Sequence, residues 1–444
     1  MIITGTNNGS LQEVMDKALH DLRNDPKNNY LTARIGSGKD ALEVHAANKR
    51  GFVIGLDYKT NGAVGYMSPT ISGATGNLVT THSPDLDRMT CNYQYMQYGH
   101  EVDNENVANS RPGMHVGATA KALAKSKEMK RRLEMEEWYF CRGDGSQIIG
   151  DITAGVSIAA LATGTLTLSG ARDGAGAAML RVGQVIRIYD VTLATLKSVA
   201  TVTAKTTNGA VSIVPQTALT SGNAVVDTDV VLPQGDTTAP TTTGVKGLPY
   251  LAGRTSGNFF DKTLSAVPAL QPIVDASTTT FTRTTMEYLN ARHEIRNNGD
   301  PTTQICTSIA QRSNYYAQFY AQNTAQVHVV GDGRPGIDVG GKKLGDYTFW
   351  GAMIKAYKMI HPKYWFNLDF SSFYRLTLKE SEEMLTQASP YLQKIAGGAY
   401  TNALQSFSDD YLEYLSPNPA KNSAFTALTF SGLPLWVNDP YTGS

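Results

Sequence analysis

The 444-residue sequence has few cysteines, and their spacing excludes two kinds of site. Cys91, Cys141 and Cys306 lie far apart, so there is no Cys-x-x-Cys pair for zinc binding or redox chemistry. An odd, sparse count fits a reducing cytosol better than a disulfide-bonded scaffold. The start of the chain has no basic segment followed by an apolar stretch, and the most apolar run, 152–168, is interrupted by Thr, Ser and Gly. We therefore expect no signal peptide and no membrane partner, and a chain made in the cytoplasm.

There is also no excess of charge of either sign, because 39 Lys and Arg residues balance 39 Asp and Glu residues. A general nucleic-acid binder usually carries a basic excess, so this composition argues against that class. Zero net charge removes the long-range repulsion between copies and permits dense self-association. The hydrophobic content of 41% excludes a wholly disordered chain, and the length suggests two or three units with their own cores.

Catalytic and metal-binding constellations are missing as well. The segment 35–40 (IGSGKD) resembles part of a phosphate loop, but Ala33 and Asp40 stand where that motif needs Gly and Ser or Thr, so we interpret it as a flexible turn. His293-Glu294 lacks the second His of a zinc-protease helix, since Asn297 stands there. The other histidines are scattered. We expect no catalytic residue, no cofactor, no metal and no enzymatic activity.

Two helices are indicated in the first third of the chain. Ser10 and Glu13 form a capping box before an amphipathic helix over 10–24. The segment 114–142 is the strongest helix signal, since it is rich in Ala, Leu, Met, Lys and Glu and Gly143 follows it. At about 1.5 Å per residue such a helix would be a rod of roughly 43 Å, which suits a structural spine. The tripeptide Arg142-Gly143-Asp144 is then interpreted as a helix end rather than an adhesion motif.

Between these helices the chain is predicted to be extended. Strands are expected at 52–58 and 91–100, joined by a long polar stretch over 60–84. A loop of this length with little core of its own is typical of lids and partner-binding arms.

The segment 150–245 has a different composition, with no Glu, His, Cys, Trp or Phe and with Tyr189 as its only aromatic residue. Short Val, Ile, Leu and Thr alternations recur about every ten residues and predict a small β-barrel or sandwich, inserted in an α/β host. The alternations are at 165–168, 185–188, 199–202, 211–214 and 225–232. After the insert, the sequence predicts helices at 282–297, 303–323, 378–388 and 399–406 and strands at 349–360, 364–370 and 424–437.

Two side-chain patterns are explained by structural roles rather than by ligand binding. The basic run 121–132 could contact DNA, but it more often forms a solvated helix face with pairs such as Lys130–Glu134 and Arg132–Glu136. Tyr315, Tyr316, Phe319 and Tyr320 lie at helical spacing, which favours core or subunit-interface packing over ligand stacking.

The order of these segments resembles the major capsid proteins of tailed bacteriophages, which have the Hong Kong 97-like capsid fold. Six segments carry the resemblance: the helix exit 136–146 (EEWYFCRGDGS), the element 179–186 (MLRVGQVI), the stretches 247–251 (GLPYL) and 270–275 (LQPIVD), and the segments 400–404 (YTNAL) and 416–428 (SPNPAKNSAFTAL).

The resemblance implies an α+β chain with the Hong Kong 97-like capsid fold and an added all-β insertion domain. It divides the chain into an N-terminal arm (1–49), an E-loop (50–110), a P-domain spine helix (111–149), a β-barrel-like insertion domain (150–245), and an A-domain with returning P-domain strands (246–444). Many copies would form the pentamers and hexamers of an icosahedral head shell around double-stranded DNA. The shell would contact this DNA weakly and without sequence specificity.

The implied location is the virion, after assembly in the host bacterial cytoplasm. The implied partners are further copies of the chain, a separate scaffolding protein, a portal and a decoration protein. Three alternatives stay open: an encapsulin-like nanocompartment shell, a phage tail or decoration protein built around the β-insert, and an enzyme with an α/β core and an accessory β-domain.

Overall fold

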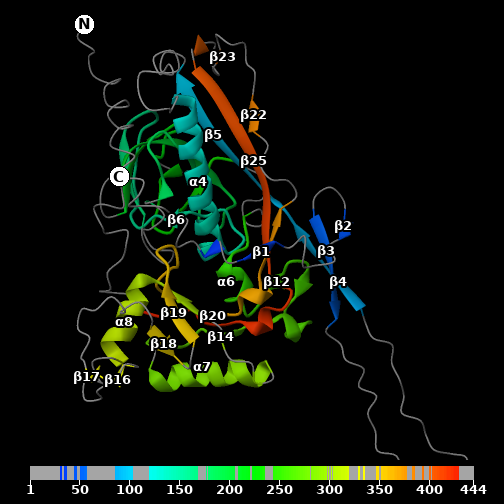
Figure 1. Cartoon of the computed structure of the whole chain (residues 1–444). Coiled ribbons are helices and arrows are strands. Elements are labelled where there is room, and N and C mark those ends of the chain that lie inside the picture. Colours follow the sequence, from blue (N-terminus) through cyan, green and yellow to red (C-terminus); the bar gives the residue numbers. More distant parts are fainter. Residues whose placement is uncertain are drawn as a thin grey trace, which may run out of the picture.

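The computed structural model is a mixed α+β chain, with one long helix, several β-sheets and few other helices (Figure 1). It describes residues 31–32, 35–37, 45–47, 51–57, 86–103, 120–168, 177, 179–205, 209–220, 223–235, 244–280, 282–297, 299, 302, 304–319, 329–330, 334–335, 347–349, 352–377, 383–385, 393–394, 400–401 and 403–429. The helix predicted at 10–24, the polar stretch at 60–84 and the end of the predicted strand 424–437 lie outside these residues.

The long helix α4 (Ala120–Arg142) packs along strand β5 (Gln94–Asp103). Its 23 residues span about 35 Å. The helix ends where predicted, because the backbone N–H of Gly143 donates to the carbonyl of Tyr139 and a Cβ at Gly143 would meet two carbonyl oxygens. The expected start at 114 lies outside the described residues.

Beside α4 a five-stranded sheet is built on one long strand, β25 (Ala403–Leu415). β25 pairs antiparallel with β5 from Ala403–Asp103 to Leu412–Gln94. Three shorter strands complete the sheet: β1 (Gly36–Ser37), β21 (Tyr374–Thr377) and β22 (Glu383–Leu385). The interpretation of 35–40 as a flexible turn is therefore wrong for Gly36 and Ser37, which pair in parallel with β21.

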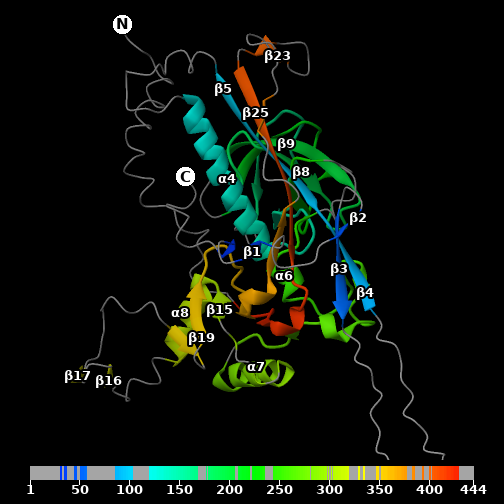
Figure 2. The ribbon, with the colours of Figure 1, turned by 45° about the vertical axis from the view of Figure 1, so that its right-hand side comes forward.

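A second, three-stranded sheet lies to one side of the body (Figures 1 and 2). It consists of β2 (His45–Ala47), β3 (Gly51–Asp57) and β4 (Leu86–Asn92). β4 runs into β5 with only Tyr93 between them, so a single stretch of extended chain joins this hairpin to the long strand β25. The strands predicted at 52–58 and 91–100 correspond to β3 and to the junction of β4 with β5.

The sheet formed from residues 150–233 has six strands, and the five predicted strand segments all contribute to it. A bridge between Ile152 and Leu168 joins the two outer strands, so the sheet closes on itself. Burial alternates along β9 and β10, whereas β8 and β11 are buried almost throughout, and Ile186, Val202, Val211 and Ile213 are fully covered. The order is β6 (Gly150–Asp151), β11 (Val230–Pro233), β8 (Val185–Tyr189), β9 (Leu196–Lys205), β10 (Ala210–Pro215) and β7 (Gly164–Thr167).

Another six-stranded sheet forms the lower part of the molecule in Figure 1 and mixes parallel and antiparallel pairs. Its order is β14 (Ile273–Asp275), β26 (Ser423–Phe425), β20 (Trp365–Leu368), β15 (Gln304–Thr307), β19 (Ala352–Ala356) and β18 (Tyr347–Phe349). Helix α7 (Arg283–Arg296) packs against β14 and β26, and α8 (Ile309–Phe319) packs against β19. Met286, Leu289, Ile305, Trp365 and Phe425 form their shared core.

The remaining short elements are α6 (Leu248–Leu251) and the 3-10 turns η5 (Pro268–Leu270), η7 (Phe370–Ser372) and η8 (Pro419–Lys421). Three two-stranded pairs complete the description: β12 (Asn258–Phe259) with β13 (Lys262–Thr263), β16 (Val329–Val330) with β17 (Arg334–Pro335), and β23 (Gln393–Lys394) with β24 (Tyr400–Thr401).

Three of the four helices predicted after residue 246 need correction. The helix predicted over 303–323 begins only at Ile309, because residues 304–307 are all buried as the central strand β15. The helix predicted at 399–406 is wrong, since the described residues there form β24 and the start of β25. Within 378–388 the described residues form strand β22. In each case pairing with a distant strand outweighs the local helix preference.

Candidate functional site

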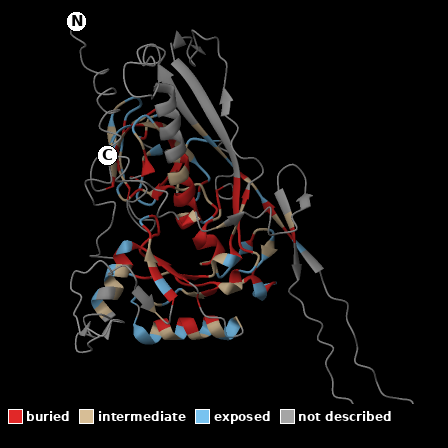
Figure 3. Ribbon diagram, viewed as in Figure 1, coloured by how far each residue is buried: buried red, intermediate tan, exposed pale blue. Residues whose placement is uncertain are grey.

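Several segments that are distant in the sequence pack around the C-terminal half of α4, and buried residues concentrate there (Figure 3). Met135, Trp138, Phe140 and Cys141 belong to the large apolar core. Charged residues enter this core beside them. We define the α4 junction as Glu136, Glu137, Arg142, Lys246 and Glu413, because each of these residues ties two separate segments together.

Glu137 holds a segment that precedes the hairpin. Its carboxylate accepts hydrogen bonds from the backbone N–H of Leu31 at 2.8 Å, from the N–H of Thr32 at 3.0 Å and from the Thr32 hydroxyl at 2.8 Å. Burial raises the pKa of Glu137, and these three donors act in the opposite direction. The Cys141 thiol is a fourth donor, at 3.5 Å. A buried carboxylate with four donors is a specific anchor, because each donor would otherwise lose its partner.

Glu136 and Arg142 connect α4 to the strands beneath it. The Glu136 carboxylate accepts from Arg132 at 3.1 Å and from Arg375 of β21 at 3.0 Å. The helical pair with Arg132 is the one expected from the sequence, but the expected solvated face is wrong here, because both residues are buried. Arg142 donates to the carbonyl of Met359 at 2.7 Å, and its guanidinium lies 4.4 Å from the centre of the Trp138 ring. Arg142 therefore belongs to the structural core, as expected if the Arg-Gly-Asp tripeptide is a helix end.

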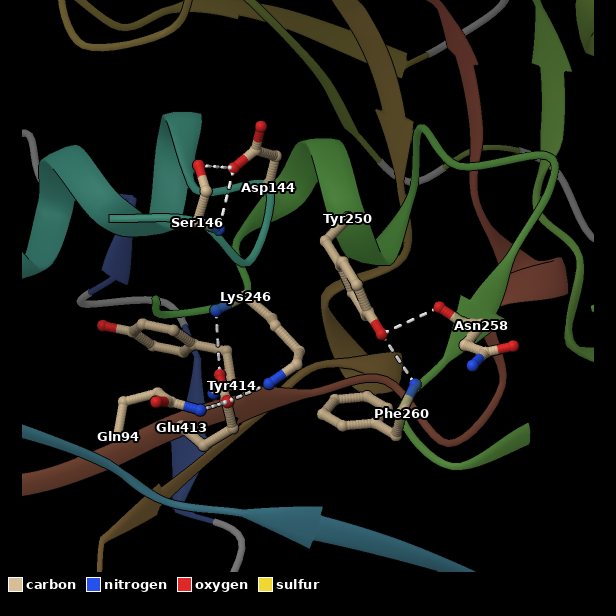
Figure 4. Close-up of polar contacts among 9 residues, drawn as sticks. All are labelled: Gln94, Asp144, Ser146, Lys246, Tyr250, Asn258, Phe260, Glu413 and Tyr414. Carbon is tan, nitrogen blue, oxygen red and sulfur yellow. Dashed lines mark hydrogen bonds and ion pairs between the residues drawn. The ribbon is translucent and has the colours of Figure 1, made fainter. Parts of the chain in front are cut away.

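Glu413 and Lys246 form the centre of the junction (Figure 4). The Lys246 ammonium lies 2.8 Å from the Glu413 carboxylate, and the Lys246 backbone N–H donates to the same group at 2.9 Å. Gln94 of β5 donates to it at 3.3 Å, and the backbone N–H of Tyr414 at 3.1 Å. Burial lowers the pKa of Lys246, but the Glu413 carboxylate outweighs this effect and raises it above the ordinary value.

Residues 143–146 and 244–247, which flank the closed six-stranded sheet, are hydrogen-bonded to each other. Gly244 donates to Gly145 at 3.0 Å, Gly247 donates to Gly143 at 2.9 Å, and Asp144 bridges to Lys246. The Asp144 side chain closes the turn by accepting from the backbone N–H of Ser146 at 2.9 Å (Figure 4). The chain thus leaves the α4 junction for the sheet and returns to it at one place.

An aromatic group covers the return segment. The Tyr250 hydroxyl donates to the carbonyl of Asn258 at 3.0 Å and accepts from the N–H of Phe260 at 2.7 Å (Figure 4). Its ring stacks on Phe259 at 5.6 Å, and the Lys246 ammonium lies 5.2 Å from the Phe260 ring. These contacts hold residues 246–260 against the junction and shield the ion pair from water.

The other candidates from the sequence do not form a reaction site. All three cysteines are buried and free, and burial raises the pKa of Cys91 and of Cys141, which leaves both thiols unreactive. His293 is buried in α7. Tyr315 packs on Trp365 and Phe349, the packing expected from the sequence, whereas the side chains of the other three aromatic residues of that group lie outside the description.

The described residues contain no group of three or more His, Cys, Asp or Glu side chains that could hold a metal ion. In the same part of the chain no helix is both long enough and apolar enough to cross a membrane. The α4 junction itself has buried carboxylates that are saturated with donors. Its arrangement serves to hold segments together.

Of the junction residues, only Glu136 was paired correctly from the sequence. Glu137, Lys246 and Glu413 were missed because their partners lie 105 or more residues away. A signal was present in the segment 411–415 (YLEYL), where a single Glu stands between apolar residues of a strand. A charged residue in that position needs a buried partner.

No known protein-family model matches the chain, and no curated protein matches it. Solved structures do resemble it along most of its length. A structure described as the cyanophage A-1(L) capsid asymmetric unit is 11% identical, with 90% of this chain and 94% of that chain covered and a TM-score of 0.49. The capsid of a native GTA particle is 6% identical, with 88% and 90% covered and a TM-score of 0.41.

A structure from Mycobacterium phage Adephagia is 9% identical to the chain, with 89% and 90% covered and a TM-score of 0.42.

Proposed function

We propose that this chain is the major capsid protein of a tailed bacteriophage, with the Hong Kong 97-like capsid fold. In this proposal residues 1–49 form the N-terminal arm, 50–110 the E-loop and 111–149 the P-domain spine helix. Residues 150–245 form the insertion domain, and 246–444 the A-domain with the returning P-domain strands. Copies assemble into pentamers and hexamers that close an icosahedral head around double-stranded DNA.

The observation that carries the proposal is the placement of the hairpin β3–β4. In both ribbon views it lies beside the body, away from α4 and the lower sheet (Figures 1 and 2). It is joined to the body by the continuous strand stretch β4–β5, which pairs with β25 along ten residue pairs. Ile54, Met89 and Cys91 of the hairpin are buried in the main apolar core and anchor it, and β2 adds a third strand to its sheet. A small sheet that is anchored in this way and lies to one side of the body is suited to packing on a neighbouring copy.

The α4 junction supports the same interpretation. It fastens the start of β5, which follows the hairpin, through Gln94. It fastens the segment before the hairpin through Glu137, and the return from the closed sheet through Lys246. Forces applied to any of these segments would be passed to the helix α4 and the strand β25. A shell that withstands the pressure of packaged DNA needs a subunit whose projecting parts are tied to one rigid element.

The path of the chain supports the insertion domain. Residues 143–146 and 244–247 are hydrogen-bonded side by side, and the strands between them pair with one another and with no other described strand. An insertion with adjacent ends can be accommodated without disturbing its host. The balanced charge of the chain suits a shell that contacts DNA weakly, because a strongly basic lining would bind DNA that must move in and out.

Negative-stain electron microscopy of the purified chain, alone and with the other head proteins, tests the proposal. We expect capsomer rings or closed shells, and nuclease-protected DNA in particles from infected cells. Protected protein cargo in place of DNA would indicate a nanocompartment shell. Binding only to particles formed by another protein would indicate a decoration or tail protein. A chain that stays monomeric under all assembly conditions contradicts the proposal.

A further inference from the structure

Three turns gather at one end of the closed six-stranded sheet. Tyr189 at the end of β8 pairs with Leu196 at the start of β9 and with Val230 at the start of β11. Residue 161, before β7, donates its N–H to Pro215 at the end of β10. The connections 152–163, 190–195 and 216–229 therefore lie together, and we call their described residues the turn end.

The turn end exposes large apolar side chains to solvent. Leu161 is 76% exposed, Val191 is 59% exposed and Val226 is 50% exposed, one from each connection. Three non-glycine residues with positive φ lie here as well: Leu161 at 59°, Leu193 at 60° and Thr228 at 77°. Strained backbone of this kind persists where the surrounding structure holds it and concentrates at functional sites.

The turns are held in place before any partner arrives. The Lys197 ammonium binds the Asp229 carboxylate at 2.6 Å and the carbonyl of Ala224 at 2.9 Å, which fixes the connection before β11. Asp190 accepts from the Thr192 hydroxyl at 2.6 Å and the Thr195 N–H at 3.0 Å, which fixes the turn after β8. A preformed surface loses less conformational freedom when it binds.

The charge of the turn end is negative. Its charged residues are Asp190, Asp227 and Asp229. Lys197 reaches it from β9 and is paired with the buried Asp229. The Thr192 hydroxyl and the Thr195 N–H lower the pKa of Asp190, so this group stays ionised. Asp227 is exposed. The surface therefore combines apolar side chains with the negative charges of Asp190 and Asp227.

The outer face of α7 has the complementary character. Tyr288 is 62% exposed and Ile295 is 80% exposed, the largest exposure among the exposed large apolar side chains of the described residues. Arg292 lies between them at helical spacing, with its guanidinium 5.7 Å from the centre of the Tyr288 ring. Arg296 is exposed on the same helix, whereas the exposed Arg283 is paired with Glu287 at 2.8 Å. We call Tyr288, Arg292 and Ile295 the α7 stripe.

We propose that the turn end of one copy docks on the α7 stripe of a second copy. The two surfaces are each apolar, and their charges are opposite. The two surfaces lie in different parts of the folded molecule, because α7 is at the bottom edge and the closed sheet is beside α4 in both ribbon views (Figures 1 and 2). A single copy therefore does not bring them together. A contact between two different surfaces is heterologous, and such contacts generate rings when the rotation closes.

This contact rests on the proposed function, because it supplies one of the interfaces that a shell needs. The apolar pair would be Leu161 with Ile295 or Tyr288, surrounded by Arg292 opposite Asp190 or Asp227. Rim charges of this kind mainly select the partner and its register.

Cysteine cross-linking between two separately purified variants tests the contact. Leu161→Cys and Ile295→Cys are mixed in assembling conditions and oxidised, and the native cysteines do not interfere because all three are buried. We expect a disulfide-linked dimer in the mixture and little in either variant alone. Val182→Cys is the matched control, since Val182 is also exposed, at 63%, but lies before β8 at the opposite end of the same sheet. Equal cross-linking of Val182→Cys and Leu161→Cys with Ile295→Cys overturns the contact.

A charge exchange gives a second, independent readout. Arg292→Asp alone and Asp227→Arg alone should each raise the protein concentration needed for assembly by about 5-fold, the effect of losing one exposed ion pair. The two substitutions combined in one chain should restore assembly, because each copy then offers the reversed pair. No rescue in the double variant, or a cross-link formed only with a different added protein, contradicts the contact between copies. If wild-type protein forms shells while the cross-link is absent, the contact fails and the proposed function stands.

Discussion

The Lys246 ammonium and the Glu413 carboxylate lie 2.8 Å apart although 167 residues separate them in the sequence. Glu413 is fully buried and Lys246 nearly so. Removing one member of such a pair leaves a buried charge without compensation, which is more costly than losing the pair as a whole. This contact joins the return from the closed sheet to the long strand of the main sheet.

We therefore expect Lys246→Met to destabilise the chain by about 3–5 kcal/mol. The double variant Lys246→Met, Glu413→Gln should recover much of that loss, because neither charge then remains in the core and the Gln amide oxygen still accepts from the neighbouring N–H groups. Urea unfolding of unassembled subunits, followed by tryptophan fluorescence, measures both effects. A double variant less stable than Lys246→Met would show that the two residues do not act as a pair.

Glu137 offers a separate test of how the segment before the hairpin is held. Glu137→Gln keeps the shape of the side chain but leaves one acceptor oxygen for four donors, namely the Leu31 N–H, the Thr32 N–H, the Thr32 hydroxyl and the Cys141 thiol. We expect a loss of about 1–3 kcal/mol in local stability, since a buried donor loses its partner.

Amide hydrogen exchange measures this loss directly. Leu31 and Thr32 should exchange faster in Glu137→Gln, while the amides of β20 should be unchanged. Thr32→Val, which removes only the hydroxyl donor, is the matched control and should have a smaller effect. Unchanged protection of residues 31 and 32 in Glu137→Gln would contradict the anchor.

Gly247 is expected to tolerate no side chain. A Cβ there would overlap the carbonyl oxygens of Tyr139 and Phe140, which belong to the backbone of α4 and cannot move aside cheaply. Gly247→Ala should cost at least about 3 kcal/mol or prevent folding. At Gly235 the nearest atom is the end of the Arg187 side chain, 3.2 Å away, so Gly235→Ala is the control and should be milder. Soluble yield and thermal unfolding compare the two variants, and equal effects would contradict the close approach at Gly247.

The elements set by local pattern could be predicted from the sequence. The end of α4 follows from Gly143, and the strands between residues 164 and 233 follow from their alternation. Strand β25 was mistaken for helix at its start, because its pairing with β5, some 300 residues earlier, cannot be seen in the local sequence. The same applies to the α4 junction. The sequence shows the helical pair Arg132–Glu136 but does not show that Arg375 binds the same carboxylate.

The buried His293 predicts a dependence of stability on pH. His293 is 2% exposed, its Nδ1 has no hydrogen-bond partner among the described residues, and burial lowers its pKa below 6.5, with Asp369 acting weakly in the opposite direction. In the unfolded chain the imidazole takes up a proton near pH 6.5. Below that pH the unfolded state binds more protons than the native state, so stability falls as the pH falls, by up to about 1.4 kcal/mol per unit until the lowered native pKa is reached.

His293→Leu should remove this dependence, because Leu has a similar apolar bulk and does not titrate. When the pH is lowered from 7.5 to 5.5, we expect the amides of α7 to exchange faster in the wild-type chain, after correction for the intrinsic exchange rate. The same change of pH should have much less effect in the variant. Helix α8, which packs on β19 instead, serves as the internal reference in the same samples. The α7 stripe lies on this helix, so looser packing of α7 at low pH should also weaken the proposed contact between copies. This weakening should be larger in the wild type than in His293→Leu. An α7 whose protection is insensitive to pH in the wild type would show that His293 is not held neutral by its burial.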